Sequence, residues 1–184
     1  MPTVHIKGMV CSRCVLVVQQ LLQRLSISYQ SVNMGTVQLI QELSALEKET
    51  FSKELSKLGF EIIDDRKSQT VEKVKTLLIA LIQHQDNDIK IKYSQFLSDE
   101  LGMEYSYLSS LFSSAEHTTI EKYIIQLKID KVKELLKYDE LSLKEIAERL
   151  NYSSVQALSN QFRKVTSLSP SEFKNQNKLQ FQIP

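Results

Sequence analysis

The feature that most constrains this chain is an internal repeat in its second half. A pattern of apolar, small and turn-forming residues recurs after about fifty positions, with one extra residue in the second turn. The first copy consists of Leu97, Ser98, Leu101, Gly102, Met103, Leu108 and Phe112, and the second of Ile146, Ala147, Leu150, Asn151, Tyr152, Leu158 and Phe162. Since repeated sequence folds into repeated structure, the repeat predicts an architecture rather than a single element.

Each copy contains the residue types that a helix-turn-helix unit needs. A small residue, Ser98 or Ala147, stands where the two helices should cross, and Gly102 or Asn151 stands where the turn needs a left-handed conformation. The second helix of each copy should bury an apolar stripe, formed by Leu108, Leu111 and Phe112 in one copy and Leu158, Phe162 and Val165 in the other. The repeat therefore predicts two helix-turn-helix units.

The opposite faces of these second helices are polar and are the candidate DNA-reading surfaces. The candidate residues are Tyr105, Ser106, Ser109 and Ser110 in the first unit, and Val155, Gln156, Ser159, Asn160 and Arg163 in the second. Amide side chains can pair with adenine edges and arginine with guanine or phosphate, whereas serine discriminates poorly. We therefore expect more base discrimination from the second unit. The alternative is that both faces are simply solvated, as on any amphipathic helix.

A long helix is predicted between the two units, from Thr119 to Tyr138. At 1.5 Å per residue it is roughly 30 Å long, close to the roughly 34 Å of one turn of B-DNA. Such a spacer can place two reading helices in successive major grooves. Three helix starts carry local signals: Thr118 with Glu121, Ser142 with Glu145, and Ser169-Pro170 with Glu172.

The repeated units and the segment Phe162-Arg163-Lys164 to Phe173 resemble the DNA-binding module of the AraC/XylS family of bacterial transcription regulators. Lys128 takes the place of a linker-helix arginine that is usual in that family, and His117 and Ser167 take the places of glycines. The resemblance implies a double-stranded DNA partner for residues 69–178. RNA polymerase and a second copy of the chain are further candidate partners.

The first third of the chain predicts a separate small domain. Alternating Val4 and Ile6 indicate a strand, a helical pattern follows Cys14, two strands should turn near Met34-Gly35, and a helix from about Ser44 should stop at Gly59 before a last strand. This βαββαβ order is typical of a ferredoxin-like α/β fold. We place this domain at residues 1–66, a charged and polar linker at Asp64 to Gln69, and the next helix from about Thr70.

The motif Gly8-Met9-Val10-Cys11-Ser12-Arg13-Cys14, with Leu58-Gly59-Phe60, resembles the heavy-metal-associated domain of soft-metal chaperones and pumps. Two thiolates at a helix N-terminus suit Cu(I) or another soft metal better than Zn(II), which prefers four ligands. Cys11 and Cys14 are therefore candidate metal ligands. A thiol redox switch, a metal chaperone and a pair of ordinary thiols are the alternatives, because spacing does not separate them. We expect Met9 to be a core residue rather than a ligand.

Composition narrows the remaining classes. A net charge of +1 gives no general attraction to nucleic acid, so the DNA-binding prediction rests on geometry. The sequence contains no phosphate-binding glycine loop, nucleophile motif or apolar run long enough for a membrane span, and it does not start like a signal peptide. We expect a cytoplasmic, non-enzymatic protein of two domains, with an α/β domain followed by an all-helical one.

Overall fold

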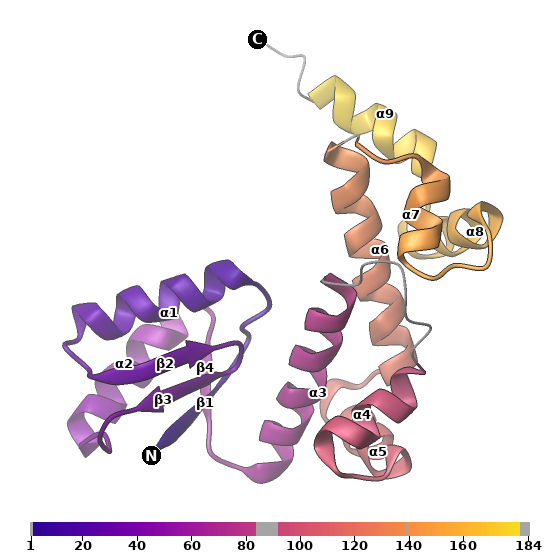
Figure 1. Ribbon diagram of the computed structural model, residues 1–184. Coiled ribbons are helices and arrows are strands. Elements are labelled where there is room, and N and C mark those ends of the chain that lie inside the picture. Colours follow the sequence, from indigo (N-terminus) through magenta and orange to yellow (C-terminus); the bar gives the residue numbers. More distant parts are fainter. Residues whose placement is uncertain (1, 84–91, 139, 181–184) are drawn as a thin grey trace. The chain divides into compact units, whose positions relative to one another are not determined.

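The computed structural model describes residues 2–83, 92–138 and 140–180, drawn in colour in Figure 1. Its contacts divide the chain into two compact units. The first comprises Met1–Ile79 with Ser106–Leu111, and the second comprises Ala80–Tyr105 with Phe112–Pro184. The helix-turn-helix repeat thus contributes residues to both units, which are described separately below.

The first unit contains the predicted βαββαβ series. Its elements are β1 (Thr3–Lys7), α1 (Ser12–Arg24), β2 (Tyr29–Asn33), β3 (Thr36–Leu39), α2 (Ala45–Lys57) and β4 (Glu61–Ile63). The strands form one antiparallel sheet in the order β2-β3-β1-β4. The turn at Met34-Gly35 and the stop at Gly59 are confirmed, since both glycines have positive φ. The predicted element order is therefore confirmed, and the assignment to the ferredoxin-like fold stays a prediction.

One face of the sheet carries the core of this unit. Val32 pairs with Val37 across β2 and β3, and Val4 pairs with Val37 across β1 and β3, so these side chains share one face. Phe51 from α2 and Leu22 from α1 are fully buried in the same cluster. Both helices must therefore cover that face. Met9 is 1% exposed, which confirms that it is a core residue.

Helix α3 (Arg66–Gln83) begins four residues earlier than predicted. Asp65 caps it, because its carboxylate accepts the backbone N–H of Ser68 at 2.8 Å. Residues 66–69, which we expected to belong to a charged linker, are therefore helical. Their polarity misled the prediction, because lysine and glutamine are good helix formers as well as common linker residues.

A buried carboxylate holds α3 against the rest of the first unit. Glu72 is 5% exposed and accepts the backbone N–H of Gly8 at 3.0 Å. Its second oxygen lies 3.3 Å from the ammonium of Lys75. Gly35 lies beside the same helix, and a Cβ there would come within 3.3 Å of Thr76 Oγ1. A charged group buried in this way is satisfied only when both partners are in place, so α3 has a defined position in this unit.

The second half of the chain is helical, as predicted. The helices are α4 (Tyr93–Leu101), α5 (Tyr105–Glu116), α6 (Ile120–Tyr138), α7 (Leu143–Arg149), α8 (Val155–Thr166) and α9 (Pro170–Gln180). In Figure 1, α6 is the long helix of this half, and α7, α8 and α9 gather at its C-terminal end. Two helix-turn-helix units joined by a long helix are therefore confirmed.

Three local predictions need correction. Helix α6 starts at Ile120, and its N-terminal cap is Thr119 rather than Thr118, because the Thr119 hydroxyl accepts the N–H of Lys122 at 3.2 Å. The Glu121 carboxylate bonds to a tyrosine instead of closing a capping box. Val165 is 37% exposed and Leu111 is only partly buried, so the apolar stripes are narrower than predicted. The capping boxes at Ser142 and at Ser169 are confirmed.

Candidate nucleic-acid interface

The two turns of the repeat are built by the same backbone hydrogen bond. The N–H of Met103 donates to the carbonyl of Ser98 in the first turn, and the N–H of Tyr152 donates to that of Ala147 in the second. Gly102 and Asn151 occupy the left-handed region at φ +63° and +55°. Helix α5 starts three residues after Gly102, and α8 starts four residues after Asn151. The extra residue therefore lies between the left-handed position and the second helix, as predicted.

Helix α5 presents the serine face of the first helix-turn-helix unit. Ser106 and Ser110 are exposed and Ser109 is half-buried, while Leu108 and Phe112 are buried on the other side. Tyr105 does not extend freely to solvent, because its hydroxyl donates to Glu121 Oε1 at 2.5 Å. Burial and this carboxylate raise the pKa of Tyr105, and the tyrosine in turn lowers the pKa of Glu121. Tyr105 thus anchors the start of α5 to α6.

Helix α8 presents the amide and arginine face of the second helix-turn-helix unit. Gln156, Asn160 and Arg163 are exposed, whereas Val155 and Ser159 are half-buried. The Gln156 amide donates to Asn160 Oδ1 at 2.9 Å, which holds the two side chains together one turn apart. The Arg163 side chain is 68% exposed, and its guanidinium lies 3.9 Å from the Glu172 carboxylate. The N–H of Ala157 donates to Ser154, which caps the helix.

Aromatic pairs fix α5 and α8 to their neighbours. Phe112, at 0% exposure, meets Tyr123 of α6 with ring centroids 5.4 Å apart. Phe162, also at 0% exposure, meets Phe173 of α9 edge-on at 5.6 Å. The equivalent phenylalanines of the repeat thus have equivalent roles. Each places an apolar anchor opposite the polar face of its helix.

Lys128 lies in the middle of α6 and contacts residues of both helix-turn-helix units. Its ammonium donates to the carbonyl of Leu150 at 2.8 Å and lies 5.4 Å from the ring centre of Tyr93 and 5.2 Å from that of Tyr152. Burial lowers the pKa of Lys128 and raises the pKa of Tyr152 to about 12, with Tyr93 adding to the second effect. The hydroxyl of Tyr152 donates to Gln161 of α8 at 2.8 Å.

Cys11 and Cys14 converge at the start of α1. Cys11 is the N-terminal cap residue of that helix, and the two Sγ atoms lie 3.5 Å apart. The backbone N–H of Cys14 is the largest cause that lowers the pKa of the Cys11 thiol, and the Arg13 N–H and charge add to it. Within the described residues, no cluster of three or more histidine, cysteine or acidic side chains has the geometry to hold a metal. In this part of the chain, the candidate metal donors are therefore the sulfurs of Cys11 and Cys14.

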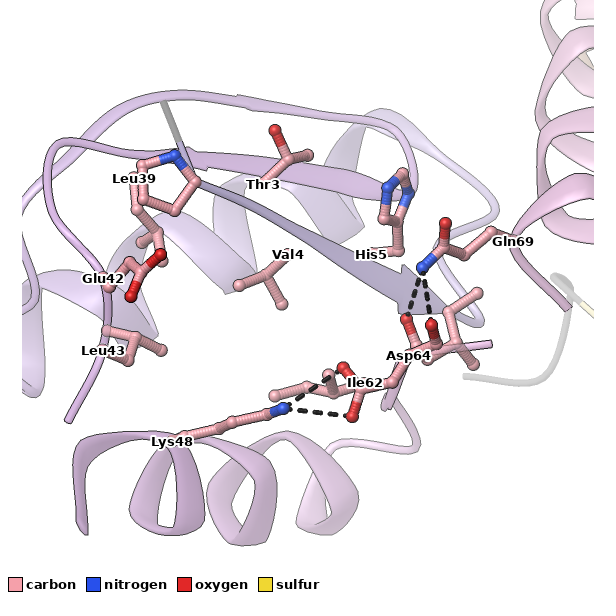
Figure 2. Close-up of a pocket in the computed structure, with 12 residues that line it drawn as sticks. Thr3, Val4, His5, Leu39, Glu42, Leu43, Lys48, Ile62, Asp64 and Gln69 are labelled. Carbon is pink, nitrogen blue, oxygen red and sulfur yellow. Dashed lines mark hydrogen bonds and ion pairs between the residues drawn. The ribbon is translucent and has the colours of Figure 1, made fainter. Parts of the chain in front are cut away.

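A hollow of about 210 Å³ also opens on the first unit, between β1, β4 and α2 (Figure 2). Its lining includes the apolar side chains of Val4 and Ile62. Lys48 pairs with Asp64 at 3.0 Å, and the Gln69 amide donates to the carbonyls of Ile63 and Asp64 at 3.2 Å. Because these polar groups already bond to one another, they offer little to a ligand. None of the candidate DNA or metal residues lines the hollow.

Two contacts of the site were not predicted from the sequence. The Tyr105–Glu121 bond joins residues sixteen positions apart, and the Gly8–Glu72 bond joins residues sixty-four apart. A glutamate between Val71 and Val74 was the available signal for the second, since a charge beside an apolar stripe sometimes marks a buried partner. Neither pair follows from spacing alone.

A family match covers much of the second half of the chain. Residues 97–176 match the family described as "Helix-turn-helix domain". The chain is 35% identical to the xylose operon regulatory protein of Haemophilus influenzae over 85 residues, which are 46% of this chain and 22% of that protein. Three curated relatives, that one included, are spanned over 22% to 34% of their length. Resemblance of residues 1–65 to the heavy-metal-associated domain stays a prediction.

Two solved structures have the same fold over most of their length. One is the C-terminal domain of AraT, a response regulator from Geobacillus stearothermophilus, with a TM-score of 0.51 and 23% identity over 61% of this chain and 88% of that one. The other is a transcriptional regulator with an AraC-type DNA-binding domain from Chromobacterium violaceum, with a TM-score of 0.50 and 20% identity over 58% and 93%.

Within the described residues, no helix combines the length and the apolar character needed to cross a membrane. The fold, the family match and the paired turns agree for the second half of the chain. The segment from residue 97 to residue 176 is therefore a helix-turn-helix domain with the fold of the AraC-type regulators.

Proposed function

We propose that this chain is a sequence-specific, DNA-binding transcription regulator of the AraC type. The observation that carries the proposal is the pair of helix-turn-helix units with the same turn hydrogen bond, joined by α6. Helix α6 has 19 residues and is therefore about 28 Å long, close to one turn of B-DNA. The relative named as a regulator of the xylose operon supports the same role.

In this proposal α8 reads base edges and α5 contributes contacts of lower specificity. Gln156 and Asn160 have the amide groups that recognise adenine, and Arg163 can contact guanine or phosphate. Ser106, Ser109 and Ser110 of α5 can bond to bases or phosphates. Because both units belong to one chain, a monomer has two reading helices. RNA polymerase and a second copy of the chain remain proposed partners.

The test is selection of DNA ligands from a random pool with the purified full chain, followed by competition with unrelated DNA. We expect binding to selected DNA to exceed non-specific binding by about 10³-fold or more. Gln156→Ala/Asn160→Ala should relax the sequence preference, while Gln20→Ala, which removes an exposed glutamine of α1, should not. Selected pools without a shared sequence would contradict the proposal.

A second candidate function, suggested by the close thiols, is a response of this regulator to a soft metal ion. The Sγ atoms of Cys11 and Cys14, 3.5 Å apart, are close enough to bind one ion. Two sulfur donors fit Cu(I), which accepts low coordination, better than a four-ligand zinc site. A lowered pKa of the Cys11 thiol favours the thiolate that binds metal. The ferredoxin-like fold proposed for residues 1–66 agrees with this role.

A route from the cysteines to the DNA-binding half runs through the segment that precedes them. Gly8 lies three residues before Cys11, and its N–H is held by the buried Glu72 of α3. Because α3 is the helix that we assign to the start of the DNA-binding module, a change in the cysteine loop can alter its position. Metal regulates only if it binds one arrangement better than the other.

The test is titration of the reduced full chain with Cu(I) and with Zn(II), with DNA binding measured in the same samples. We expect Cu(I) to bind and to shift DNA affinity, and Cys11→Ser/Cys14→Ser to abolish both effects. Glu72→Ala, which removes the acceptor of the Gly8 N–H, should keep metal binding but weaken its effect on DNA. DNA affinity that ignores Cu(I) and both serines would reject the metal response and leave the regulator itself intact.

A further inference from the structure

Lys128 connects parts of the helical half of the chain that are far apart in sequence. Tyr93 is the first residue of α4 in the first helix-turn-helix unit, and Leu150 and Tyr152 lie in the turn of the second. The Lys128 ammonium touches all three from the middle of the linker helix. It is therefore a side chain at which both helix-turn-helix units and their spacer meet.

A lysine is an expensive residue for this place, since removing an ammonium from water costs free energy. Its carbonyl partner and the faces of two tyrosine rings offset that cost through directed contacts. An apolar side chain of the same length would fill the space but would make no such contacts. The ammonium thus supplies orientation as well as volume.

The contact extends from the turn to the second reading helix. Tyr152 is covered on its ring face by Lys128, and its hydroxyl donates to Gln161 of α8 at 2.8 Å. Gln161 lies one position after Asn160, a candidate base-reading residue. A shift of Tyr152 relative to α6 would therefore move α8 as well.

We propose that Lys128 is a positioning residue that sets the separation between the DNA sites read by the two helix-turn-helix units. It acts through Tyr93, Leu150 and Tyr152 and does not need to touch DNA. The proposal rests on the proposed DNA-binding function, which it deepens by assigning the control of half-site spacing to one side chain.

The experiment measures affinity for selected DNA in which the distance between the two half-sites is varied by single base pairs. The wild type should prefer one separation, near the 10–10.5 bp of a helical turn. Lys128→Met should lower affinity about tenfold at that separation and flatten or shift the optimum, while binding to each isolated half-site stays within about twofold. Lys128→Arg should keep the wild-type preferred separation, because arginine keeps the charge, a hydrogen-bond donor and the stacking on both rings.

Lys137→Met is the matched control, because it removes the same charge from an exposed position of α6. It should leave the preferred separation unchanged. A general loss of stability would weaken binding at every separation alike, so the position of the optimum distinguishes positioning from a merely structural role. An unchanged, equally sharp optimum in Lys128→Met would overturn the proposal.

A second measurement does not depend on DNA. Spin labels at Gln95→Cys in α4 and Lys144→Cys in α7, in a Cys11→Ser/Cys14→Ser background, report the distance between the two helix-turn-helix units. We expect a narrow distance distribution in the parent and in Lys128→Arg, and a broadened or displaced one in Lys128→Met. A distance distribution that Lys128→Met leaves unaltered would reject the positioning role. This result does not depend on whether the chain selects a DNA sequence, so failure of the inference and failure of the proposed function can be told apart.

Discussion

Helices α5 and α8 occupy equivalent places in the repeat but present different surfaces. Both bury a phenylalanine at 0% exposure against an aromatic neighbour. The polar face of α8 carries two linked amides and an exposed guanidinium, whereas that of α5 carries serines, and its Tyr105 hydroxyl is bonded to Glu121. The buried face and the exposed face of a repeat unit can therefore diverge independently.

Under the proposed function, the difference gives one scaffold two kinds of contact with DNA. The turn hydrogen bonds and the phenylalanine anchors are shared, so they belong to the fold. The side chains that can discriminate between bases are concentrated in α8. The following predictions test the shared part first and the divergent part afterwards.

The largest effect should come from the two anchors. Phe112→Ala and Phe162→Ala each empty a fully buried site and should each cost about 3–5 kcal/mol of unfolding free energy. Urea denaturation followed by circular dichroism measures both. Similar losses would support equivalent roles, while a loss below about 1 kcal/mol at either position would break the equivalence of the repeat.

The next largest effect should distinguish the polar face of α8 from that of α5. Gln156→Ala or Asn160→Ala should reduce discrimination at one or two base positions by about 1–3 kcal/mol. The paired change Ser106→Ala/Ser110→Ala should weaken binding without changing the preferred sequence. Affinities for a set of singly substituted DNA sites measure this. Greater loss of discrimination from the serine variants would reverse the comparison.

The helix ends should respond alike in both units. His117 and Ser167 end α5 and α8 with φ of +53° and +63°, a conformation that strains residues other than glycine. His117→Gly and Ser167→Gly should each stabilise the protein by up to about 1 kcal/mol, measured by thermal unfolding. Ser114→Gly, in the interior of α5, is the control and should destabilise by about 0.5–1 kcal/mol.

The smallest effect concerns the Tyr105–Glu121 bond, which has no equivalent at Val155. Tyr105→Phe should cost about 0.5 kcal/mol at pH 7, because the bond is exposed to solvent. Because this bond lowers the pKa of Glu121 below its ordinary value of 4.5, its stabilisation exists above that pH and is lost as the pH falls below it. Urea denaturation at pH 7 and pH 3 should show the difference shrinking. Tyr107→Phe, at an exposed tyrosine, should change neither value.

Much of this fold follows from local sequence signals. Gly102 and Asn151 mark the turns, Ser142 and Ser169 mark helix starts, and the alternation of Val4 and Ile6 marks the first strand. Each signal acts within a few residues, and the structure confirms each one. The start of α3 was missed because polar residues 66–69 fit both a linker and a capped helix.

The interactions that organise the site depend instead on the tertiary fold. Lys128 was recognisable as a substituted linker-helix position, but its contacts with Tyr93 and Tyr152 require the helices to be in place. The same holds for Tyr105 and Glu121. The base-contacting roles of Gln156 and Asn160, the metal-binding roles of Cys11 and Cys14, and the domain limits 1–66 and 69–178 stay predictions.

The burial of α3 has a consequence for how such a protein can evolve. Val74 and Leu78 are buried on one side of the helix, and Glu72 and Ile79 are buried about 130° away from them. Exchange of the front domain by recombination at residue 66 would remove Gly8, whose backbone N–H donates to Glu72, and would leave that buried carboxylate without this donor. A replacement domain would have to supply a new partner for that carboxylate, so the buried acid favours inheritance of α3 together with the domain in front of it.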